Sequence, residues 1–441
     1  MKVTRIIGIS ILTVALGACS SGGSKKSTYD DGGKERLAIL SSAQGIEASD
    51  ALVNSPVILP RPYTNNQWAQ AGGNPTNAVH HLTIADQLSE VWSRNIGSGS
   101  STYQRLVSGP VVKDGVVYAM DTRSNVSAVN LANGARVWTK ELKDPDERSK
   151  VGFGGGVAAD GDKLYVTSGY GFVAALEAST GNELWRFPGK IPMRGTPTVA
   201  DGRVFSLTQD NQILVLDAET GGLIWDQVGI AETASMLGAA STAIDEGVAL
   251  IALSSGELIA MQAANGNPLW QDGLTSSNRL TPLATLADID GNPVIHNGRA
   301  YASSHAGRMV AIDMRTGERA WEADIASVTT PWIAGNYAFI VTVDAEIAAV
   351  QLSDGRVRWV SQMQRFKDQD DFKNLIKWNG PVLAGDRLIL TSSHGFIATV
   401  SPYTGDIISV KKVGTGSSTA PIVVDNTLIV LNDAGELVAY R

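Results

Sequence analysis

Short apolar runs separated by polar turns fill most of the chain, and one arrangement recurs at a fixed internal spacing. A strand-like apolar residue is followed by Gly eight positions later and by Trp four positions after that, as at Val126, Gly134 and Trp138. The remaining complete copies end at Trp185, Trp225, Trp270, Trp321 and Trp359. The spacing within a copy is constant while the distance between copies varies, so the pattern predicts β-hairpins joined by loops of different lengths.

Two further strand-like runs precede each hairpin, which gives four antiparallel strands in roughly 45 residues, the size of a propeller blade. A seventh copy has Ser409 where the others have Trp, and an eighth begins at Leu437 and reaches the C-terminus before its Gly. Trp92 supplies the missing outer strand from the other end of the repeats. We therefore predict an all-β fold, an eight-bladed β-propeller of four-stranded antiparallel blades over residues 63–441, closed by pairing of the N- and C-terminal strands. An open solenoid of the same units would need capping repeats instead.

Basic residues and a short apolar run begin the chain, followed by Leu-Gly-Ala-Cys, in which Cys19 is the only cysteine. The run is too short to span a bilayer, so residues 1–18 are predicted to be a removable signal peptide. The Leu-Gly-Ala-Cys stretch resembles a lipoprotein processing site, which implies lipid attachment at Cys19, and the Ser that follows implies the outer membrane. Residues 19–62 are predicted to be a lipid-anchored, partly flexible tether. An ordinary signal peptide with a chance cysteine is the alternative.

Composition and motifs exclude several functions. The formal net charge is −8 and becomes −10 once residues 1–18 are removed, because these carry two basic residues and no acidic one. An acidic surface does not favour nucleic acid. The sequence contains no metalloprotease, serine-hydrolase or phosphate-loop motif. The adjacent His80 and His81 are not expected to share a metal ion, because neighbouring residues on a strand face opposite sides.

The repeat Ala-x-Thr-Gly-x-x-x-Trp, present at 218–225, is similar to the quinoprotein-type repeat of eight-bladed propellers. Two families share it: the pyrroloquinoline-quinone alcohol dehydrogenases and the lipoprotein B subunit of the outer-membrane β-barrel assembly machinery. The dehydrogenases carry a vicinal Cys-Cys pair and bind calcium, whereas this chain has one cysteine and resembles the B subunit. The resemblance implies a non-catalytic scaffold without a cofactor, attached to the outer membrane and facing the periplasm. Its implied partner is the periplasmic part of the barrel-assembly protein, with unfolded outer-membrane proteins as further candidates.

Two connectors support the resemblance. Ile191, Met193 and Arg194 match a short connector with which the family contacts the barrel-forming subunit, and Asp288 and Asp290 match its Asp-x-Asp connector. Both segments join the last strand of one blade to the first strand of the next, so we expect them on the same face of the ring, two blades and roughly 90° apart. The alternative is a pair of ordinary solvated loops with Arg194 paired to a local acid.

Three points stay open in the sequence. A quinone-dependent periplasmic dehydrogenase and a cell-wall-binding propeller are the alternative functions. The stretch 362–378 is long for a connector between blades and contains several aromatic residues. It serves either as a groove or lid for a partner, or its aromatic residues pack onto the adjacent blades.

Overall fold

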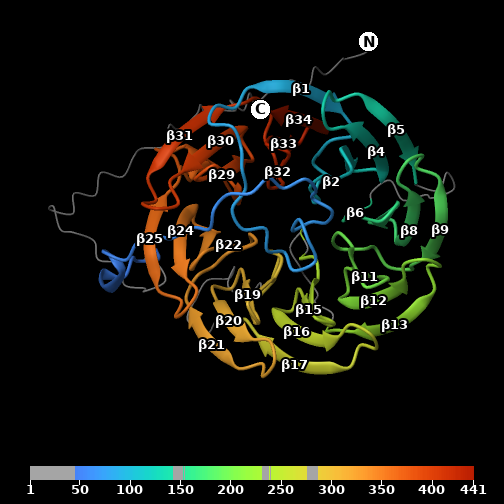
Figure 1. Cartoon of the computed structure of the whole chain (residues 1–441), viewed down its shortest axis with the longest axis horizontal. Helices are drawn as coiled ribbons and strands as arrows, with labels where there is room; N and C mark the ends of the chain where they lie inside the picture. The colour runs from blue at the N-terminus through green and yellow to red at the C-terminus, as the bar shows by residue number, and fades with distance from the viewer. Residues whose placement is uncertain (1–44, 143–151, 153, 231–237, 239, 276–286) are drawn as a thin grey trace, which may run out of the picture. The chain divides into compact units, whose positions relative to one another are not determined.

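The computed structural model describes residues 45–142, 152, 154–230, 238, 240–275 and 287–441 of the 441-residue chain. Within these residues, eight four-stranded antiparallel sheets are arranged as blades around an axis, which confirms the predicted propeller (Figure 1). Cys19 and the predicted signal peptide lie outside the described residues. None of the described helices is long and apolar enough to cross a membrane.

The first four blades follow one another along the chain. Blade one contains β2 (Val111–Lys113), β3 (Val116–Met120), β4 (Asn125–Asn130) and β5 (Arg136–Glu141); blade two contains β6 (Gly155–Asp160), β7 (Lys163–Ser168), β8 (Phe172–Glu177) and β9 (Glu183–Pro188); blade three contains β10 (Thr198–Ala200), β11 (Arg203–Leu207), β12 (Gln212–Asp217) and β13 (Leu223–Val228); blade four contains β14 (Ala243–Asp245), β15 (Val248–Ala252), β16 (Glu257–Gln262) and β17 (Pro268–Gly273).

The remaining blades complete the ring, with a short extra hairpin between blades six and seven. Blade five contains β18 (Val294–His296), β19 (Arg299–Ser303), β20 (Met309–Asp313) and β21 (Arg319–Ala323); blade six contains β22 (Trp332–Ala334), β23 (Tyr337–Val341), β24 (Glu346–Gln351) and β25 (Val357–Gln362); the hairpin contains β26 (Phe366–Asp368) and β27 (Lys373–Leu375); blade seven contains β28 (Trp378–Ala384), β29 (Arg387–Ser392), β30 (Phe396–Val400) and β31 (Ile407–Lys412); blade eight contains β32 (Ile422–Val424), β33 (Thr427–Leu431), β34 (Glu436–Tyr440) and β1 (Glu90–Asn95).

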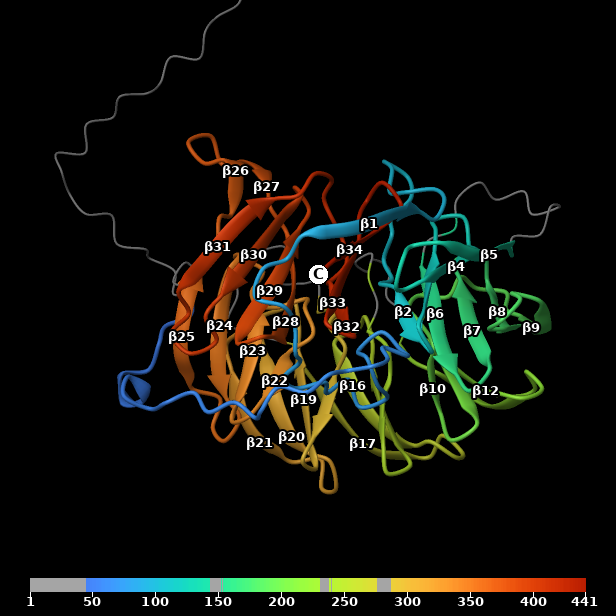
Figure 2. The ribbon, with the colours of Figure 1, turned by 45° about the horizontal axis from the view of Figure 1, so that its top comes forward.

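Both ends of the repeat region build blade eight. β1 pairs antiparallel with β34, with Trp92 opposite Ala439, and therefore forms the outer strand of a sheet whose other three strands come from the C-terminus. Figure 2 shows β1 beside β34. The predicted closure by N- and C-terminal strands is confirmed.

A tryptophan on the outer strand of one blade packs against a glycine of the next blade at seven of the eight blade interfaces. At the interface of blades three and four, the indole N–H of Trp225 donates to the carbonyl of Ala263 at 3.1 Å, and a Cβ on Gly266 would lie 2.7 Å from the ring. Gly266 has a φ of +74°, which L side chains rarely adopt. The constant Gly–Trp spacing of the sequence thus places each ring on the neighbouring blade's turn.

Residues 63–83, which include several turns, contact every blade near the axis and are called the axial segment below. Figure 1 shows this part of the chain crossing the centre of the ring. Its hydrogen-bond partners on blades one to eight, in order, are Val112, Ala159, Val199, Ile244, Ile295, Trp332, Leu383 and Asp425. The inner edge of each blade is therefore met by the same short stretch of chain.

Residues 45–62, which the sequence assigns to the tether, lie against blade six in the structure. The short 3-10 helix η2 (Asp50–Leu52) belongs to this part. The N–H of Ser49 donates to the carbonyl of Val357 at 2.8 Å, and Arg358 donates to the carbonyl of Ser55 at 2.7 Å. The compact unit containing the propeller accordingly begins at Gly45.

Candidate functional site

The first predicted connector is fixed to both blades that it joins. The N–H of Met193 donates to the carbonyl of Ser168 in blade two at 3.1 Å, and the N–H of Arg194 donates to Leu207 in blade three at 2.7 Å. The Met193 side chain is fully buried in a hydrophobic cluster of these two blades, and Ile191 is half-buried. Of the two apolar residues predicted to contact a partner, only Ile191 therefore keeps accessible surface.

Arg194 lies in a buried ion cluster and has only 6% of its surface exposed. Its Nη2 donates to Asp288 Oδ1 at 2.9 Å and to Asp290 Oδ1 at 3.1 Å, and its Nε donates to the carbonyl of Gly238 at 2.9 Å. Both carboxylates are buried as well. Arg194 therefore pairs with acids, but not with a local acid in a solvated loop as the alternative expected, because the cluster is buried and Asp288 is 94 residues away along the chain.

The two predicted connectors meet, because the Arg194 side chain of one bonds the carboxylates of the other. Each connector runs from the outer strand of one blade to the inner strand of the next blade. Gly238 belongs to the connector between blades three and four. Arg194 therefore joins three consecutive connectors, and we call residues 189–197, 238 and 287–293 the connector platform.

Two carboxylates, those of Asp288 and Asp290, face the Arg194 guanidinium in the cluster. Burial raises the pKa of Asp290, the Arg194 charge opposes this effect, and the Asp288 charge adds to it. The backbone N–H of His305 donates to the carbonyl of Asp288 at 3.0 Å, which holds the second connector on blade five. The cluster therefore depends on Arg194 for its electrostatic stability.

Two exposed apolar residues that the sequence analysis did not identify precede Gly238 along the chain. Val228 ends β13 and is 73% exposed, and Ile230 follows it in the same connector as Gly238 and is 59% exposed. Asn211 holds this connector by donating to the carbonyl of Ile230 at 2.6 Å. Their signal in the sequence is a pair of apolar residues at the end of an outer strand and just beyond it, where polar residues are expected.

The stretch 362–378 packs partly on the ring, as one of the two alternatives expected, while its role toward a partner stays a prediction. Ile376 and Trp378 are buried, and the indole of Trp378 donates to the carbonyl of Gln364 at 2.9 Å. Phe372 and Leu375 are exposed on the β26–β27 hairpin, which projects beyond the blades in Figure 2. The aromatic residues thus divide between packing on the ring and an exposed hairpin.

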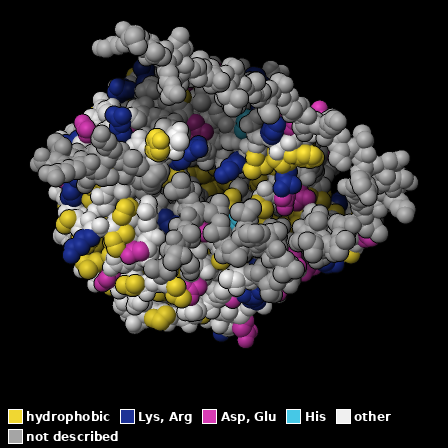
Figure 3. All heavy atoms as spheres, turned by 180° about the vertical axis from the view of Figure 1, so that it is seen from behind, with side chains coloured by type: hydrophobic (Ala, Val, Ile, Leu, Met, Phe, Trp, Pro, Cys, Tyr) yellow, Lys and Arg dark blue, Asp and Glu magenta, His cyan; other side chains and the backbone are white. Residues whose placement is uncertain are grey.

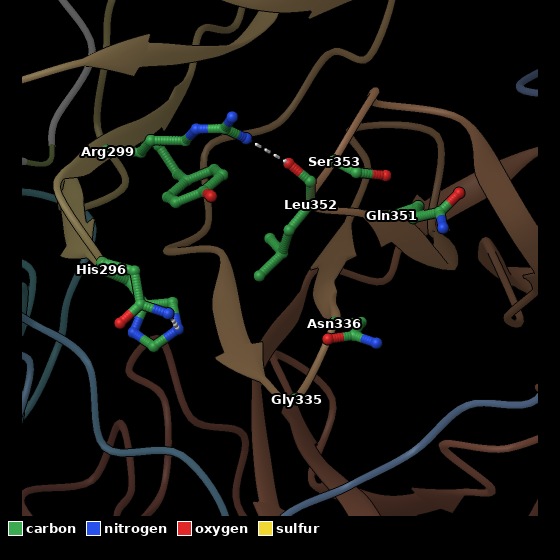
Figure 4. Close-up of a pocket in the computed structure, with 9 residues that line it drawn as sticks. His296, Arg299, Gly335, Asn336, Gln351, Leu352 and Ser353 are labelled. Carbon is green, nitrogen blue, oxygen red and sulfur yellow. Dashed lines mark hydrogen bonds between the residues drawn. The ribbon is translucent and has the colours of Figure 1, made fainter.

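A pocket of about 460 Å³ lies between blades five and six, lined by His296, Arg299, Gly335, Asn336, Gln351, Leu352 and Ser353 among others (Figure 4). Arg299 spans it by donating to the carbonyl of Leu352 at 3.2 Å. Its lining contains no carboxylate, so it offers no pair of acids for general acid–base work.

The face of the molecule seen in Figure 3 and the described residues were searched for a charged patch and for a metal site. In Figure 3 the described surface mixes small hydrophobic groups with charges of both signs. In the part of the chain that the structure describes, no group of three or more His, Cys, Asp or Glu residues is placed to hold a metal ion. His81 is held by the carbonyl of Pro60 at 2.8 Å, and His80 lies edge-on to His296 with ring centres 4.9 Å apart.

Eight four-stranded blades with seven Trp–Gly contacts define the molecule as a quinoprotein-like eight-bladed propeller. A family model described as outer membrane protein assembly factor BamB matches residues 81–146 and 122–361, which is more than half of the chain. The chain belongs to this family.

Curated relatives agree with the family model. The chain is 26% identical over 356 residues to the outer membrane protein assembly factor BamB of Yersinia pestis, covering 80% of this chain and 88% of the relative. It is likewise 26% identical over 354 residues to the protein of that name from Escherichia coli strain K12, covering 79% and 88%.

Solved structures show the same fold. BamB from Moraxella catarrhalis has a TM-score of 0.64 at 20% identity and covers 80% of this chain and 98% of that chain. A quinohemoprotein alcohol dehydrogenase from Comamonas testosteroni has a TM-score of 0.64 at 15% identity, covering 85% and 80%. At such identities the likeness concerns the fold, which assembly factors and dehydrogenases share.

Proposed function

We propose that this protein is a non-catalytic scaffold in the assembly of outer-membrane β-barrel proteins. It is anchored through a lipid at Cys19 and faces the periplasm. It docks through the connector platform on the periplasmic domains of a barrel-assembly protein. Membership of a family named for outer membrane protein assembly supports the process, and the Arg194 cluster, which is the observation that carries the proposal, supports the docking site.

A docking surface made of loops binds more tightly when the loops are already held in one arrangement, because ordering them on binding costs affinity. Arg194 holds the loops in this way, because its side chain links its own connector to the two connectors that follow. With 6% of its surface exposed, Arg194 has little area to offer a partner. We therefore assign Arg194, Asp288 and Asp290 the role of positioning residues.

Direct contact is assigned to accessible residues next to the cluster. Val228, at the end of β13, and Ile230, in the connector that Arg194 bonds at Gly238, are exposed apolar side chains. Ile191 is half-buried on the neighbouring connector. Apolar side chains at the centre of an interface commonly carry much of the binding energy, surrounded by residues that exclude water.

Site variants test this assignment in a binding assay with the purified periplasmic domains of the barrel-assembly protein from the same organism. Val228→Asp and Ile230→Asp together are expected to weaken binding about ten-fold or more. Val137→Asp is the matched control, because Val137 is 51% exposed on the outer strand β5 of blade one, away from the platform. Equal binding by all variants, each checked for its native tryptophan fluorescence, would overturn the docking site.

The non-catalytic assignment has its own test. Incubation with pyrroloquinoline quinone and calcium, followed by a dye-reduction assay with alcohols, is expected to give no turnover. Cofactor absorbance retained by the protein, together with dye reduction, would favour the alternative hypothesis of a dehydrogenase. The only support for that hypothesis in the comparisons is the shared fold.

A further inference from the structure

The pocket between blades five and six (Figure 4) is built from turns at one end of the strands. Its lining comes from the β18–β19 turn of blade five and from the β22–β23 and β24–β25 turns of blade six. The connectors follow the fourth strand of each antiparallel blade, so these turns lie at the opposite ends of the strands from the connector platform. The volume of about 460 Å³ is within the range of pockets that hold small molecules.

The equivalent position between blades two and three is acidic. Lys163, the first residue of β7, pairs there with Glu219, which lies two residues after the end of β12. Asp160 ends β6 and Asp217 ends β12. Burial, together with the charges of these three acids, raises the pKa of Tyr165 to about 12. At this interface the protein itself supplies the anions that surround the cation.

Blades five and six keep the cation but have no acid at the three equivalent positions. Arg299 begins β19 as Lys163 begins β7. His296 ends β18, Gln351 ends β24, and Ser353 lies two residues after the end of β24. Burial lowers the pKa of His296, so this imidazole is neutral at pH 7. Arg299 is therefore surrounded by neutral side chains in place of the three acids.

The charge of Arg299 is left for an anion from outside the protein. Its guanidinium donates to the neutral carbonyl of Leu352 at 3.2 Å. Asp313, opposite Arg299 in β20, accepts hydrogen bonds from two backbone N–H groups of its own turn. Asp354, the next acid along blade six, pairs with Arg356. In a chain with a net charge of −8, a cation facing a pocket whose lining has no carboxylate is a site for an anionic group.

The rest of the lining offers neutral hydrogen-bonding groups. The side chains of Asn336 and Ser353 are exposed. The amide oxygen of Gln351 is buried without a hydrogen-bond partner in the described part of the chain, so the protein does not fix this amide, which can turn toward a ligand. Amides and hydroxyls pair well with hydroxyl groups, whereas a ligand ammonium group would need a carboxylate. The lining therefore fits a ligand with one anionic group and several hydroxyl groups.

We propose that the pocket between blades five and six binds a small hydroxylated carboxylate, such as a sugar acid. Arg299 holds the carboxylate through its fork of N–H groups. Asn336, Gln351 and Ser353 hydrogen-bond the hydroxyl groups. One guanidinium balances one carboxylate, whereas a phosphate monoester carries close to two negative charges at neutral pH. This site goes beyond the proposed function and does not depend on it, because it lies away from the connector platform.

Glucuronate is the probe for this site, titrated into the intact protein by isothermal titration calorimetry. We expect saturable binding. Glucose has the hydroxyl groups without the charge, and acetate has the charge without the hydroxyl groups, so each is expected to bind about ten-fold more weakly or not at all. Equal binding of glucose or acetate, tighter binding of glucose 6-phosphate, or no saturable binding of glucuronate would overturn the proposal.

Two variants locate the binding site. Arg299→Gln removes the charge but keeps an N–H donor, and is expected to weaken glucuronate binding about ten-fold or more. Ser353→Glu places an acid where Glu219 pairs with Lys163, so it is expected to pair with Arg299 and to abolish binding; Ser353 is exposed, so the fold tolerates the change. Ala264→Glu, at the equivalent exposed turn position of blade four, is the matched control and leaves binding unchanged. Unchanged binding by Ser353→Glu, or an equal loss in the control, would contradict the site.

Discussion

Replacing Arg194 by Ala is expected to destabilise the propeller strongly rather than only to weaken binding. The substitution removes the cation that faces two buried carboxylates, and also a hydrogen bond to the Gly238 carbonyl. Removing one partner of a buried ion pair costs about 3–5 kcal/mol, because it leaves an uncompensated buried charge. The lower part of this range is expected, because Asp290 can escape part of the cost by taking up a proton.

The pH dependence of this loss follows from Asp290. Burial already raises its pKa above the unfolded value of about 3.9, and loss of the opposing Arg194 charge raises it further. A carboxyl with a raised pKa in the folded state binds more protons folded than unfolded, so stability falls as the pH rises through the folded pKa. The deficit of Arg194→Ala is therefore larger at about pH 7.5 than at about pH 5.

Urea unfolding followed by tryptophan fluorescence measures this loss at both pH values. Ile191→Ala on the same connector is a suitable control, because Ile191 is half-buried and uncharged. A change in unfolding free energy below about 0.5 kcal/mol, the range of ordinary surface substitutions, would refute the role given to the cluster. So would a deficit that is independent of pH.

Three further predictions concern other parts of the molecule. Burial lowers the pKa of His80 and of His296, and the His80 charge lowers that of His296 further, so stability is lost as the pH falls from about 6.5 toward the lowered values; His80→Gln is expected to reduce this acid-dependent shift of the urea midpoint. Trp225→Ala removes a buried ring between blades three and four and is expected to cost about 3–5 kcal/mol in the same assay. Cys19→Ser is expected to move the protein from the membrane fraction to the soluble periplasmic fraction, whereas unchanged fractionation would argue against lipid attachment there.

The blades were predictable because their signal is local. The glycine and tryptophan of one copy belong to a single hairpin, and each ring meets the equivalent glycine of the next copy, as Trp225 meets Gly266. The missing Trp at Ser409 and the early Trp92 were sufficient to predict how the ring closes. Because the same Gly–Trp spacing recurs in successive copies, the sequence was enough to predict the eight-bladed architecture.

The site was predicted as residues but not as an arrangement. Arg194 and Asp288 are 94 positions apart, and an ion pair leaves no periodic trace in the sequence. Arg194, which the sequence analysis assigned to a partner contact, is buried in the structure, and we propose that it positions loops instead. The axial segment was missed for a similar reason. Its bonds reach all eight blades, but its sequence, for example Asn65–Gln70, has the periodicity of neither a strand nor a helix.

The most direct test of the scaffold account is site-specific photo-crosslinking in cells with an unnatural amino acid at position 230. The account predicts a covalent adduct with the barrel-assembly outer-membrane protein, identified by mass spectrometry, from the exposed connector that carries Ile230. The same crosslinker at position 137, on the outer strand of blade one, should give none. An adduct from position 137 but not from position 230, or no adduct with this protein from either position, would contradict docking through the connector platform.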